Sequence, residues 1–435
     1  MNKLVKFWQM TVSRRGSRPA IIEADSGRVL TIAKLAAEAK QRAEQLPVHI
    51  RARWIAFCLP NGAEWLVRFL AIQHRGAVAV PLDPSLTSEA QEYAAHGLGA
   101  QFLWGQDDLQ PLRRTPKPLR NVCFIKATSG TSGQPKAVPC TAEHLVGDGW
   151  NILRTMGVRA ADRNLAIIPL GHSYGLGNLV LPLLMQGTAV VCAQTFVPRQ
   201  ILQLIGHHQV TVFPAVPAIL RALAQVDGAT KPPSLRLVIS AGGLLSAEVA
   251  QQFHQRYGIK IRNFYGSSET GGICYDRSGN AALSGRGVGK PLIGVTVRVR
   301  RDGHVAVRSR AGCATLPDLG EWNRYGELRL LGRVGQVADI AGKKVSPLEV
   351  ERALRGLRGV REAWVTVLKD KRGNDFLAAA VETEQGRDEI EQALLLNLPA
   401  WKLPKALFLA AALPRSDRGK LHTAELRARL SVSLP

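Results

Sequence analysis

Short apolar runs alternate with helix-like segments from residue 54 to residue 264, and this alternation constrains the fold more than any other feature of the sequence. Predicted strands lie at residues 54–59, 76–82 and 235–240, and predicted helices lie at residues 63–75, 198–207 and 247–257. Strands that are joined in turn by helices pair in parallel sheets, whose faces the helices cover. The sequence therefore predicts the α/β class, with parallel-rich sheets flanked by helices in a large N-terminal domain.

The pattern changes after residue 295. Residues 296–300, 304–309 and 327–330 are short alternating segments, which predict a β-rich subdomain. Beyond residue 333, predicted helices at residues 347–357 and 387–396 flank two predicted strands, which indicates a small α+β domain. Because 435 residues are too many for one core, we expect an N-terminal domain over residues 1–332 and a C-terminal domain over residues 333–435.

The charge of the chain indicates the kind of partner it binds. The formal net charge is +23, and the Lys and Arg residues are dispersed along the sequence. Nucleic-acid binding favours basic residues that are clustered on one face, so the sequence predicts no nucleic-acid partner. An anionic ligand or an acidic protein fits the excess charge better.

The cysteines and apolar runs indicate a reduced, aqueous compartment. Six cysteines are scattered without a C-x-x-C pair or the spacing of a metal site. The N-terminus has no apolar run long enough for a signal peptide, and the longest apolar run, residues 179–193, is interrupted by Gln186 and Gly187. We therefore expect a cytoplasmic protein with no membrane span.

Residues 128–136, T-S-G-T-S-G-Q-P-K, combine residue types that bind phosphate. Gly130 and Gly133 let backbone N–H groups turn toward an anion, hydroxyl side chains donate hydrogen bonds, and Lys136 adds a mobile charge. The spacing is not that of a P-loop, in which a helix directly follows the lysine. The same composition also suits a solvated turn between a strand at residues 122–125 and a helix at residues 142–153.

Residues 263–271 follow a predicted buried strand, and ligands of open α/β sheets bind at the carboxyl ends of strands. The ring of Tyr265 offers a face on which a planar base can stack, and the carboxylate of Glu269 can bind Mg²⁺. An ordinary turn with an exposed glutamate would show the same features, so this segment alone does not decide between the two.

Two further segments are less distinctive. The carboxylate of Asp318 can accept hydrogen bonds from a ribose diol, and Arg333 can donate to hydroxyl or phosphate oxygens. Residues 413–420 are a polar segment that ends in Lys420. Taken alone, an aspartate in a turn, an arginine before a loop and a charged run are all typical of a protein surface.

Together, and in this order, these segments resemble the motifs of the adenylate-forming superfamily, which includes acyl- and aryl-CoA synthetases, adenylation domains of peptide synthetases and luciferases. The resemblance covers nearly the whole chain. The matching segments are residues 128–136, 169–175, 240–246, 265–269, 317–320, 332–333, 342–351 and 414–420.

The resemblance implies a two-step reaction with ATP and Mg²⁺. A small carboxylic acid attacks the α-phosphate to form an acyl-adenylate, and a thiol of CoA or of the phosphopantetheine arm of an acidic acyl carrier protein then takes the acyl group. The resemblance also implies that the small C-terminal domain is mobile and rotates about a hinge between the two steps.

Roles follow for individual residues. The ATP-binding residues of the resemblance are Thr128, Ser129, Gly130, Thr131, Ser132, Gly133, Lys136, Gly243, Asn263, Tyr265, Gly266, Ser267, Ser268, Asp318 and Arg333. The catalytic residues are Lys420, Glu269 and His172, with Glu269 also the metal ligand; the acyl substrate lies against His172, Ala241 and Gly242; the hinge and thiol tunnel involve Gly335 and Gly342.

Three points stay open: the second step, the class of acid, and whether the protein is an enzyme. The family commonly has Asp or Lys at the hinge position occupied by Gly335, and Asp339 replaces a lysine, so the second step is less securely implied than the first. Residues 169–178 lack the Asp that binds an α-ammonium group in amino-acid-activating relatives, which favours an aliphatic or aryl acid. A degenerate, non-catalytic protein that binds adenylate or a partner is the alternative to an enzyme.

Overall fold

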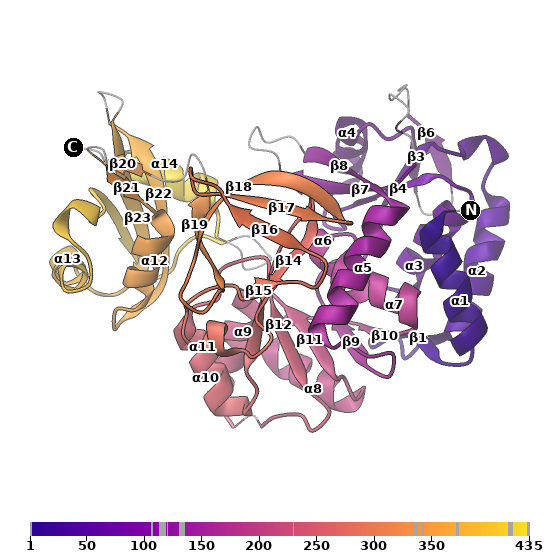
Figure 1. Cartoon of the computed structure of the whole chain (residues 1–435), viewed down its shortest axis with the longest axis horizontal. Helices are drawn as coiled ribbons and strands as arrows, with labels where there is room; N and C mark the ends of the chain where they lie inside the picture. Colours follow the sequence, from indigo (N-terminus) through magenta and orange to yellow (C-terminus); the bar gives the residue numbers. More distant parts are fainter. Residues whose placement is uncertain are drawn as a thin grey trace.

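Two large, mostly parallel sheets form the bulk of the computed structural model, which describes residues 2–105, 108–112, 119, 121–129, 135–228, 230–333, 338–340, 343–370, 374–415 and 421–432 (Figure 1). This arrangement confirms the predicted α/β class. None of the helices in the described ranges combines the length and apolar character needed to cross a bilayer.

The first sheet has nine strands, and its inner strands are parallel. In spatial order they are β15 (Lys290–Pro291), β14 (Gly271–Tyr275), β13 (Ile261–Ser267), β12 (Leu237–Ser240), β11 (Val212–Ala215), β9 (Arg163–Ala166), β10 (Ala189–Cys192), β1 (Pro19–Glu23) and β2 (Val29–Thr31). Antiparallel strands close both edges. The parallel strands β11, β12 and β13 therefore end at a common edge of the sheet.

The second sheet has six strands, and neither of the two strands at its edges was predicted. In spatial order the six strands are β6 (Leu109–Pro111), β5 (Phe102–Trp104), β3 (Trp54–Cys58), β4 (Val78–Leu82), β7 (Val122–Ser129) and β8 (Pro135–Thr141). Because β7 and β8 are antiparallel, residues 130–134 join two strands and not a strand to a helix. The prediction missed β8 because Pro135 and Pro139 break its strand pattern, although an edge strand tolerates proline.

Helices surround and separate these sheets. They are α1 (Lys3–Arg15), α2 (Ile32–Gln45), η1 (Val48–Ile50), α3 (Ala63–His74), α4 (Ser88–Leu98), α5 (Ala142–Met156), α6 (Ser173–Gly175), the π-helical turn η2 (Leu176–Val180), α7 (Leu181–Gln186), α8 (Pro198–His207), α9 (Pro217–Ala224), α10 (Ala247–Tyr257) and α11 (Asn280–Leu283). The hydroxyls of Thr141 and Ser246 cap the first turns of α5 and α10. The largest apolar cluster joins side chains of both sheets, such as Phe57 and Ile239, with helix residues such as Leu181.

A smaller antiparallel sheet of four strands forms the predicted β-rich subdomain. It contains β16 (Thr296–Val299), β17 (His304–Ser309), β18 (Gly312–Trp322) and β19 (Leu328–Arg333). The strand β18, of 11 residues, was not predicted, and Asp318 lies within it instead of in a turn. The reason is its composition, because Pro317, Asp318 and two glycines obscure a strand that is half exposed.

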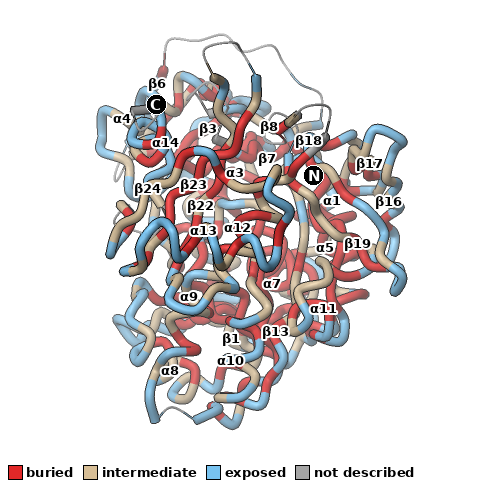
Figure 2. Tube along the Cα trace, turned by 90° about the vertical axis from the view of Figure 1, so that its left-hand side faces the viewer, coloured by how far each residue is buried: buried red, intermediate tan, exposed pale blue. Residues whose placement is uncertain are grey.

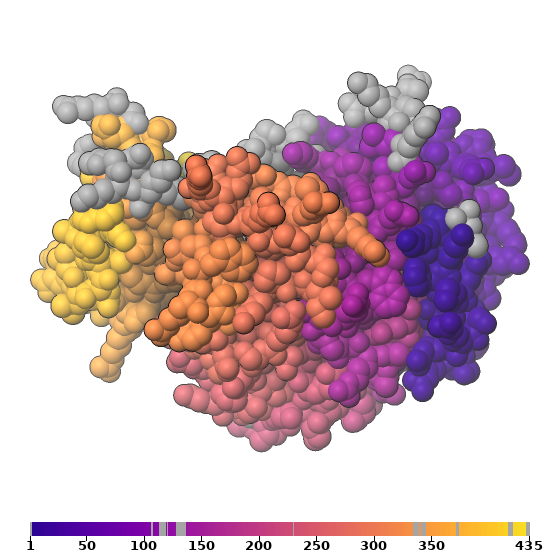
Figure 3. All heavy atoms as spheres, in the orientation of Figure 1, coloured from indigo at the N-terminus to yellow at the C-terminus, as the bar shows by residue number. Residues whose placement is uncertain are grey.

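The C-terminal part has apolar clusters of its own. Its elements are β20 (Ala338–Ile340), β21 (Lys343–Val345), α12 (Pro347–Arg355), β22 (Val360–Lys369), β23 (Asp375–Thr383), α13 (Arg387–Leu395), η3 (Ala400–Lys402), β24 (Ala406–Ala410) and α14 (Thr423–Val432). The space-filling view shows it as a lobe at one end of the molecule (Figure 3), and the burial view shows buried residues running through its central strand β23 (Figure 2). The domain boundary between residues 332 and 333 stays a prediction.

Candidate active site at the carboxyl ends of parallel strands

The carboxyl ends of β11, β12 and β13 gather several of the predicted residues. Ala241, Gly242 and Gly243 follow β12, and Tyr265 lies near the end of β13. The backbone N–H of Ala241 donates to the carbonyl of Ala215 at 3.3 Å, and Gly242 has a φ of +79°, which favours glycine. The loop after β12 can therefore pass close to a bound molecule.

Tyr265, Asp318 and Arg333 form a hydrogen-bonded chain that crosses two sheets. Tyr265 Oη donates to Asp318 Oδ2 at 3.0 Å, and Arg333 Nε donates to Asp318 Oδ1 at 2.9 Å. The carboxylate side chain is 11% exposed, whereas the arginine side chain is 61% exposed. The structure thus brings together three residues that are distant in the sequence and were predicted to bind one nucleoside.

Burial and charge perturb two members of this chain. Burial, followed by the charge of Asp318, raises the pKa of Tyr265, so its hydroxyl keeps its proton and acts as a donor. Burial works against the charge on Arg333, but the hydrogen bond to Asp318, together with the negative charge of that carboxylate and of Glu269, raises the pKa of Arg333. The chain is a fixed arrangement of two donors on one acceptor carboxylate.

The turn after β13 carries Glu269 and is internally bonded. Ser267 Oγ accepts from the backbone N–H of Thr270 at 3.2 Å and lies 3.0 Å from the Thr270 hydroxyl. Ser268 Oγ lies 2.8 Å from Ser173 Oγ, which ties this turn to the segment that contains His172. The side chain of Glu269 is exposed at the tip.

His172 and Asn263 are held by their own local bonds. His172 Nδ1 accepts from the backbone N–H of Tyr174 at 3.3 Å and caps the short helix α6. Asn263 Nδ2 donates to the carbonyl of Gly287 at 3.1 Å, so its side chain supports a neighbouring loop. Gly266 packs so closely that an added Cβ would lie 2.8 Å from the carbonyl oxygen of Gly271.

The donor set around Glu269 fits magnesium. The described residues contain no cluster of three or more His, Cys, Asp or Glu side chains that could hold a metal alone. Magnesium is commonly held by one or two carboxylates together with substrate phosphates and water, and a single exposed carboxylate is compatible with that need. Glu269 can therefore serve as one ligand of a magnesium ion whose other ligands come from a bound molecule and water.

Several predicted residues lie outside the described part of the chain. These are Gly130, Thr131, Ser132, Gly133, Gly335, Gly342 and Lys420. Thr128 and Ser129 end β7, and Lys136 lies in β8 with an exposed side chain. The predicted phosphate-binding stretch thus begins and ends on two paired strands at the edge of the second sheet.

The sequence predictions did not include Tyr174 or Lys126. The hydroxyl of Tyr174 is buried beneath the site and donates to the carbonyls of Ile239 and Ala215, at 3.1 and 3.3 Å. Lys126 is also buried, and its Nζ donates to the carbonyl of Ser268 at 3.2 Å. A charged residue inside the apolar strand V-C-F-I-K-A was the one signal that could have identified Lys126.

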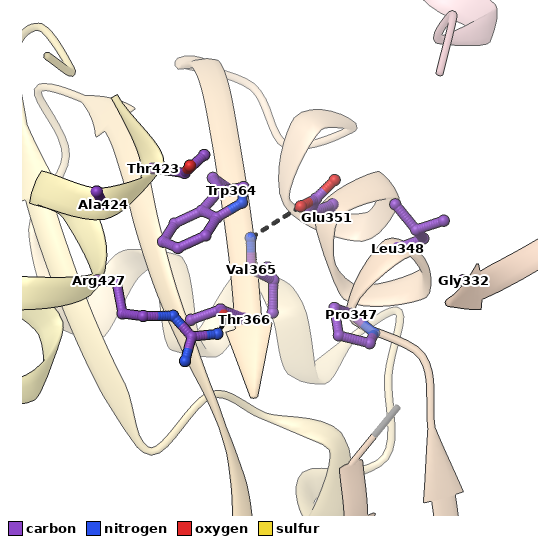
Figure 4. Close-up of a pocket in the computed structure, with 10 residues that line it drawn as sticks. All are labelled: Gly332, Pro347, Leu348, Glu351, Trp364, Val365, Thr366, Thr423, Ala424 and Arg427. Atoms are coloured by element: carbon purple, nitrogen blue, oxygen red, sulfur yellow. Dashed lines mark hydrogen bonds between the residues drawn. The ribbon is translucent and has the colours of Figure 1, made fainter. Parts of the chain in front are cut away.

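A separate cavity of about 380 Å³ lies in the C-terminal part, next to the end of β19 (Figure 4). Trp364 and Arg427 project into it, Arg427 Nη2 donates to Thr366 Oγ1 at 2.7 Å, and the backbone N–H of Val365 donates to Glu351 Oε1 at 2.9 Å. None of its described lining residues was predicted to bind substrate. Gly332, in its lining, directly precedes Arg333 of the candidate site.

Comparisons with known proteins point to one family. The sequence profile described as AMP-binding enzyme matches residues 8–114 and 105–311. The chain is 26% identical to the long-chain-fatty-acid–CoA ligase FadD13 of Mycobacterium tuberculosis, over 96% of both sequences. It is 25% identical to the feruloyl-CoA synthase of Amycolatopsis sp, over 93% of this chain and 94% of that enzyme.

The fold is also similar to that of a solved structure. The O-succinylbenzoate coenzyme A synthetase MenE from Bacillus subtilis, in complex with ATP and magnesium ion, matches with a TM-score of 0.84. The match covers 98% of this chain and 99% of that one at 24% sequence identity. The likeness extends from the large sheets through the C-terminal part.

Proposed function

The chain belongs to the AMP-binding enzyme family, and we propose that it uses ATP to activate a carboxylic acid as an acyl-adenylate and then transfers the acyl group to a thiol. The observation that carries this proposal is the chain Tyr265–Asp318–Arg333 at the carboxyl ends of the parallel strands. A nucleoside needs an aromatic face for its base and an acceptor for its ribose hydroxyls, and this chain supplies both.

Asp318 is suited to the ribose because its carboxylate is only half used. Among the described side chains, Tyr265 donates to one carboxylate oxygen and Arg333 to the other. A carboxylate has about four acceptor positions, so each oxygen retains one for a ribose hydroxyl. The two protein donors fix the direction in which those remaining positions point.

We assign the phosphates to residues 128–136 and the metal to Glu269. Magnesium, when bound there with ATP, would neutralise charge on the phosphates. In the first step an oxygen of the acid forms a bond to the α-phosphorus, the bond from that phosphorus to the bridging oxygen breaks, and pyrophosphate leaves with the electron pair. Lys420 would hold the acid and the α-phosphate oxygens together during this exchange.

In the second step a thiol sulfur bonds to the acyl carbon, the bond to AMP breaks, and the thiol proton passes to solvent. We propose CoA as the acceptor because the named relatives are CoA ligases and synthases. The phosphopantetheine arm of an acidic carrier protein has the same thiol, and the net charge of +23 suits either anionic partner. Rotation of the C-terminal part about Gly335, with Gly342 near the thiol, belongs to this proposal.

We propose an aliphatic or aryl acid, held against His172, Ala241 and Gly242. The relatives named above act by their names on long-chain fatty acid and on ferulate, and so include both classes. The six free cysteines and the use of ATP support a cytoplasmic location. The named relatives are enzymes, which favours catalysis over a non-catalytic adenylate-binding protein.

ATP–pyrophosphate exchange tests the proposal. The purified chain is incubated with Mg·ATP, labelled pyrophosphate and single acids from fatty, aryl and amino-acid panels. Exchange with at least one fatty or aryl acid supports the proposal, and adding CoA or a carrier protein then identifies the acceptor. Exchange with amino acids alone would contradict the acid class, and no exchange with any acid would favour the non-catalytic alternative.

A further inference from the structure

A buried lysine and a buried aspartate hold the two ends of the turn that carries Glu269. Lys126, in β7, is 4% exposed, and its Nζ donates to the carbonyl of Ser268 at 3.2 Å. Asp148, in α5, is 3% exposed, and its Oδ1 accepts from the backbone N–H of Gly272 at 2.8 Å. The two charged groups come from different elements and bind the backbone on either side of Glu269.

The backbone of this turn has little freedom to move. Gly271 has a φ of +71°, and an added Cβ there would lie 2.4 Å from Asp148 Oδ1. On the other side, a Cβ on Gly312 would lie 2.4 Å from the carbonyl oxygen of Glu269. The turn is therefore enclosed by β7, by α5 and by the start of β18.

Packing alone does not explain why charged groups occupy these positions. Moving an ion out of water costs on the order of several kcal/mol. Apolar residues of similar size commonly stabilise a fold equally well. Burial raises the pKa of Asp148, while the charge of Lys126 and the hydrogen bond from Gly272 act in the opposite direction. Charged residues in positions where apolar residues would hold the fold as well are typical of functional sites.

The same charges extend to the neighbouring strand. Burial raises the pKa of the Cys140 thiol, which also senses the charges of Lys126, Asp148 and Glu269. These four groups therefore share one electrostatic neighbourhood, and two of them lie on the strands β7 and β8 that bound the proposed phosphate-binding residues. A residue that holds the turn is thus also close to the place where nucleotide phosphates would bind.

We propose that Lys126 and Asp148 are positioning residues, which fix the turn between Ser268 and Gly272 so that the Glu269 carboxylate faces the metal of bound Mg·ATP. This inference rests on the proposed function, in which Glu269 binds that metal. The two residues act through the backbone of the turn and not by contact with the substrate. Partners that orient a metal ligand typically change metal affinity by about 10- to 100-fold when they are replaced.

The test is the binding of ATP, measured by isothermal titration calorimetry in magnesium and again in EDTA. In magnesium, Lys126→Met should weaken ATP binding by about tenfold, as expected for the loss of an orienting partner. In EDTA it should bind ATP as the wild type does, because the metal no longer contributes. Lys126→Arg, which keeps a cationic donor, should recover most of the affinity in magnesium.

Asp276 provides a matched control. It is a buried carboxylate at the other end of β14, and it accepts from the backbone N–H groups of Gly279 and Ala282, both at 2.9 Å. Asp276→Asn should lower the melting temperature without changing the effect of magnesium. A role of Lys126 in stability alone would make Lys126→Met resemble this control.

Other outcomes would overturn the inference. An equal loss of affinity in magnesium and in EDTA would mean that Lys126 acts on the phosphates directly. If Lys126→Met does not fold, the milder Lys126→Gln decides, and an unchanged magnesium effect in that variant contradicts the proposal. If the wild type binds ATP but supports no exchange with any acid, the proposed function is refuted. The comparison of the variants would still test whether Lys126 and Asp148 position Glu269.

Discussion

Asp318 and Arg333 face each other across the β18–β19 ladder, and Arg333 Nε donates to Asp318 Oδ1 at 2.9 Å. The same carboxylate receives the hydroxyl of Tyr265 from the first large sheet. One buried acceptor therefore connects the β-rich subdomain to the strand ends where the nucleotide is proposed to bind.

We predict that Asp318→Ala raises the KM for ATP in the exchange assay by about 10- to 100-fold, because hydrogen bonds to charged groups are worth about 1.5–3 kcal/mol. The control is Glu321→Ala, which removes an exposed ion pair with Arg329, 3.2 Å across the same ladder. That pair should contribute little. Equal KM values for both variants would contradict the ribose assignment.

Lys420→Ala should abolish acyl-adenylate formation while ATP still binds. Removing a preorganised donor from a charged transition state lowers the rate by about 10²- to 10³-fold. The exchange rate and calorimetric ATP binding are measured in parallel, with Lys405→Ala as a control for an exposed lysine of the same part. Full exchange activity in the Lys420 variant would exclude this role.

The ion pairs of Glu362 should make stability depend on pH. Burial acts to raise the pKa of Glu362, but the charges of Arg355 and Arg221, together with hydrogen bonds from Arg221 and the backbone N–H of Ala363, hold the pKa below its usual value. The stabilisation is then complete above the ordinary carboxyl pKa of about 4.3 and is lost as the pH falls through the folded value.

The measurement is the free energy of unfolding of the wild type and of Glu362→Gln across this range. Removing one partner of a buried pair costs about 3–5 kcal/mol near neutral pH. The difference between the two proteins should shrink as the medium becomes acidic. A difference that stays constant with pH would show that these charges do not stabilise the contact between α9 and β22.

Tyr174→Phe should lower the free energy of unfolding by about 0.5–1.5 kcal/mol, because the variant removes a buried hydroxyl donor that two carbonyls share. The carbonyls concerned belong to Ala215 and Ile239 in two adjacent strands, and the Ala215 carbonyl keeps its bond from the backbone N–H of Ala241. Chemical denaturation measures the loss, with the exposed Tyr325→Phe for comparison. Similar stabilities for the two variants would refute the structural role of the buried hydroxyl.

Much of the architecture could be predicted from the periodicity of the sequence. The helices α8 and α10 have the predicted bounds. Ser246 and Gly258 cap the two ends of α10, and α8 starts with a proline at its first position, which suits a helix N-terminus. The strands β8 and β18 escaped prediction because edge and half-exposed strands tolerate proline and polar residues. Local pattern carries little information about such strands, whose pairing partners decide their structure.

The sequence predicted the residues of the candidate site but not the buried residues that hold them in place. Ordered motifs identified Tyr265, Glu269, Asp318 and Arg333, and the structure brings Tyr265, Asp318 and Arg333 into one hydrogen-bonded chain. Their supports could not be predicted, because a contact between Lys126 and the carbonyl of Ser268 spans 142 positions in the sequence. Tertiary contacts of this kind produce no periodic pattern in the sequence.

Arg333 is the final residue of β19, and the next described element, β20, begins the C-terminal part. The side chain proposed to hold the ribose thus sits at the root of the arm that would carry Lys420 toward the phosphates. The position of Lys420 therefore depends on the length of chain that follows Arg333. Inserting residues after Arg333 would displace the lysine and leave the contact with the ribose intact. An insertion of a few residues would then separate ATP binding from acyl-adenylate formation.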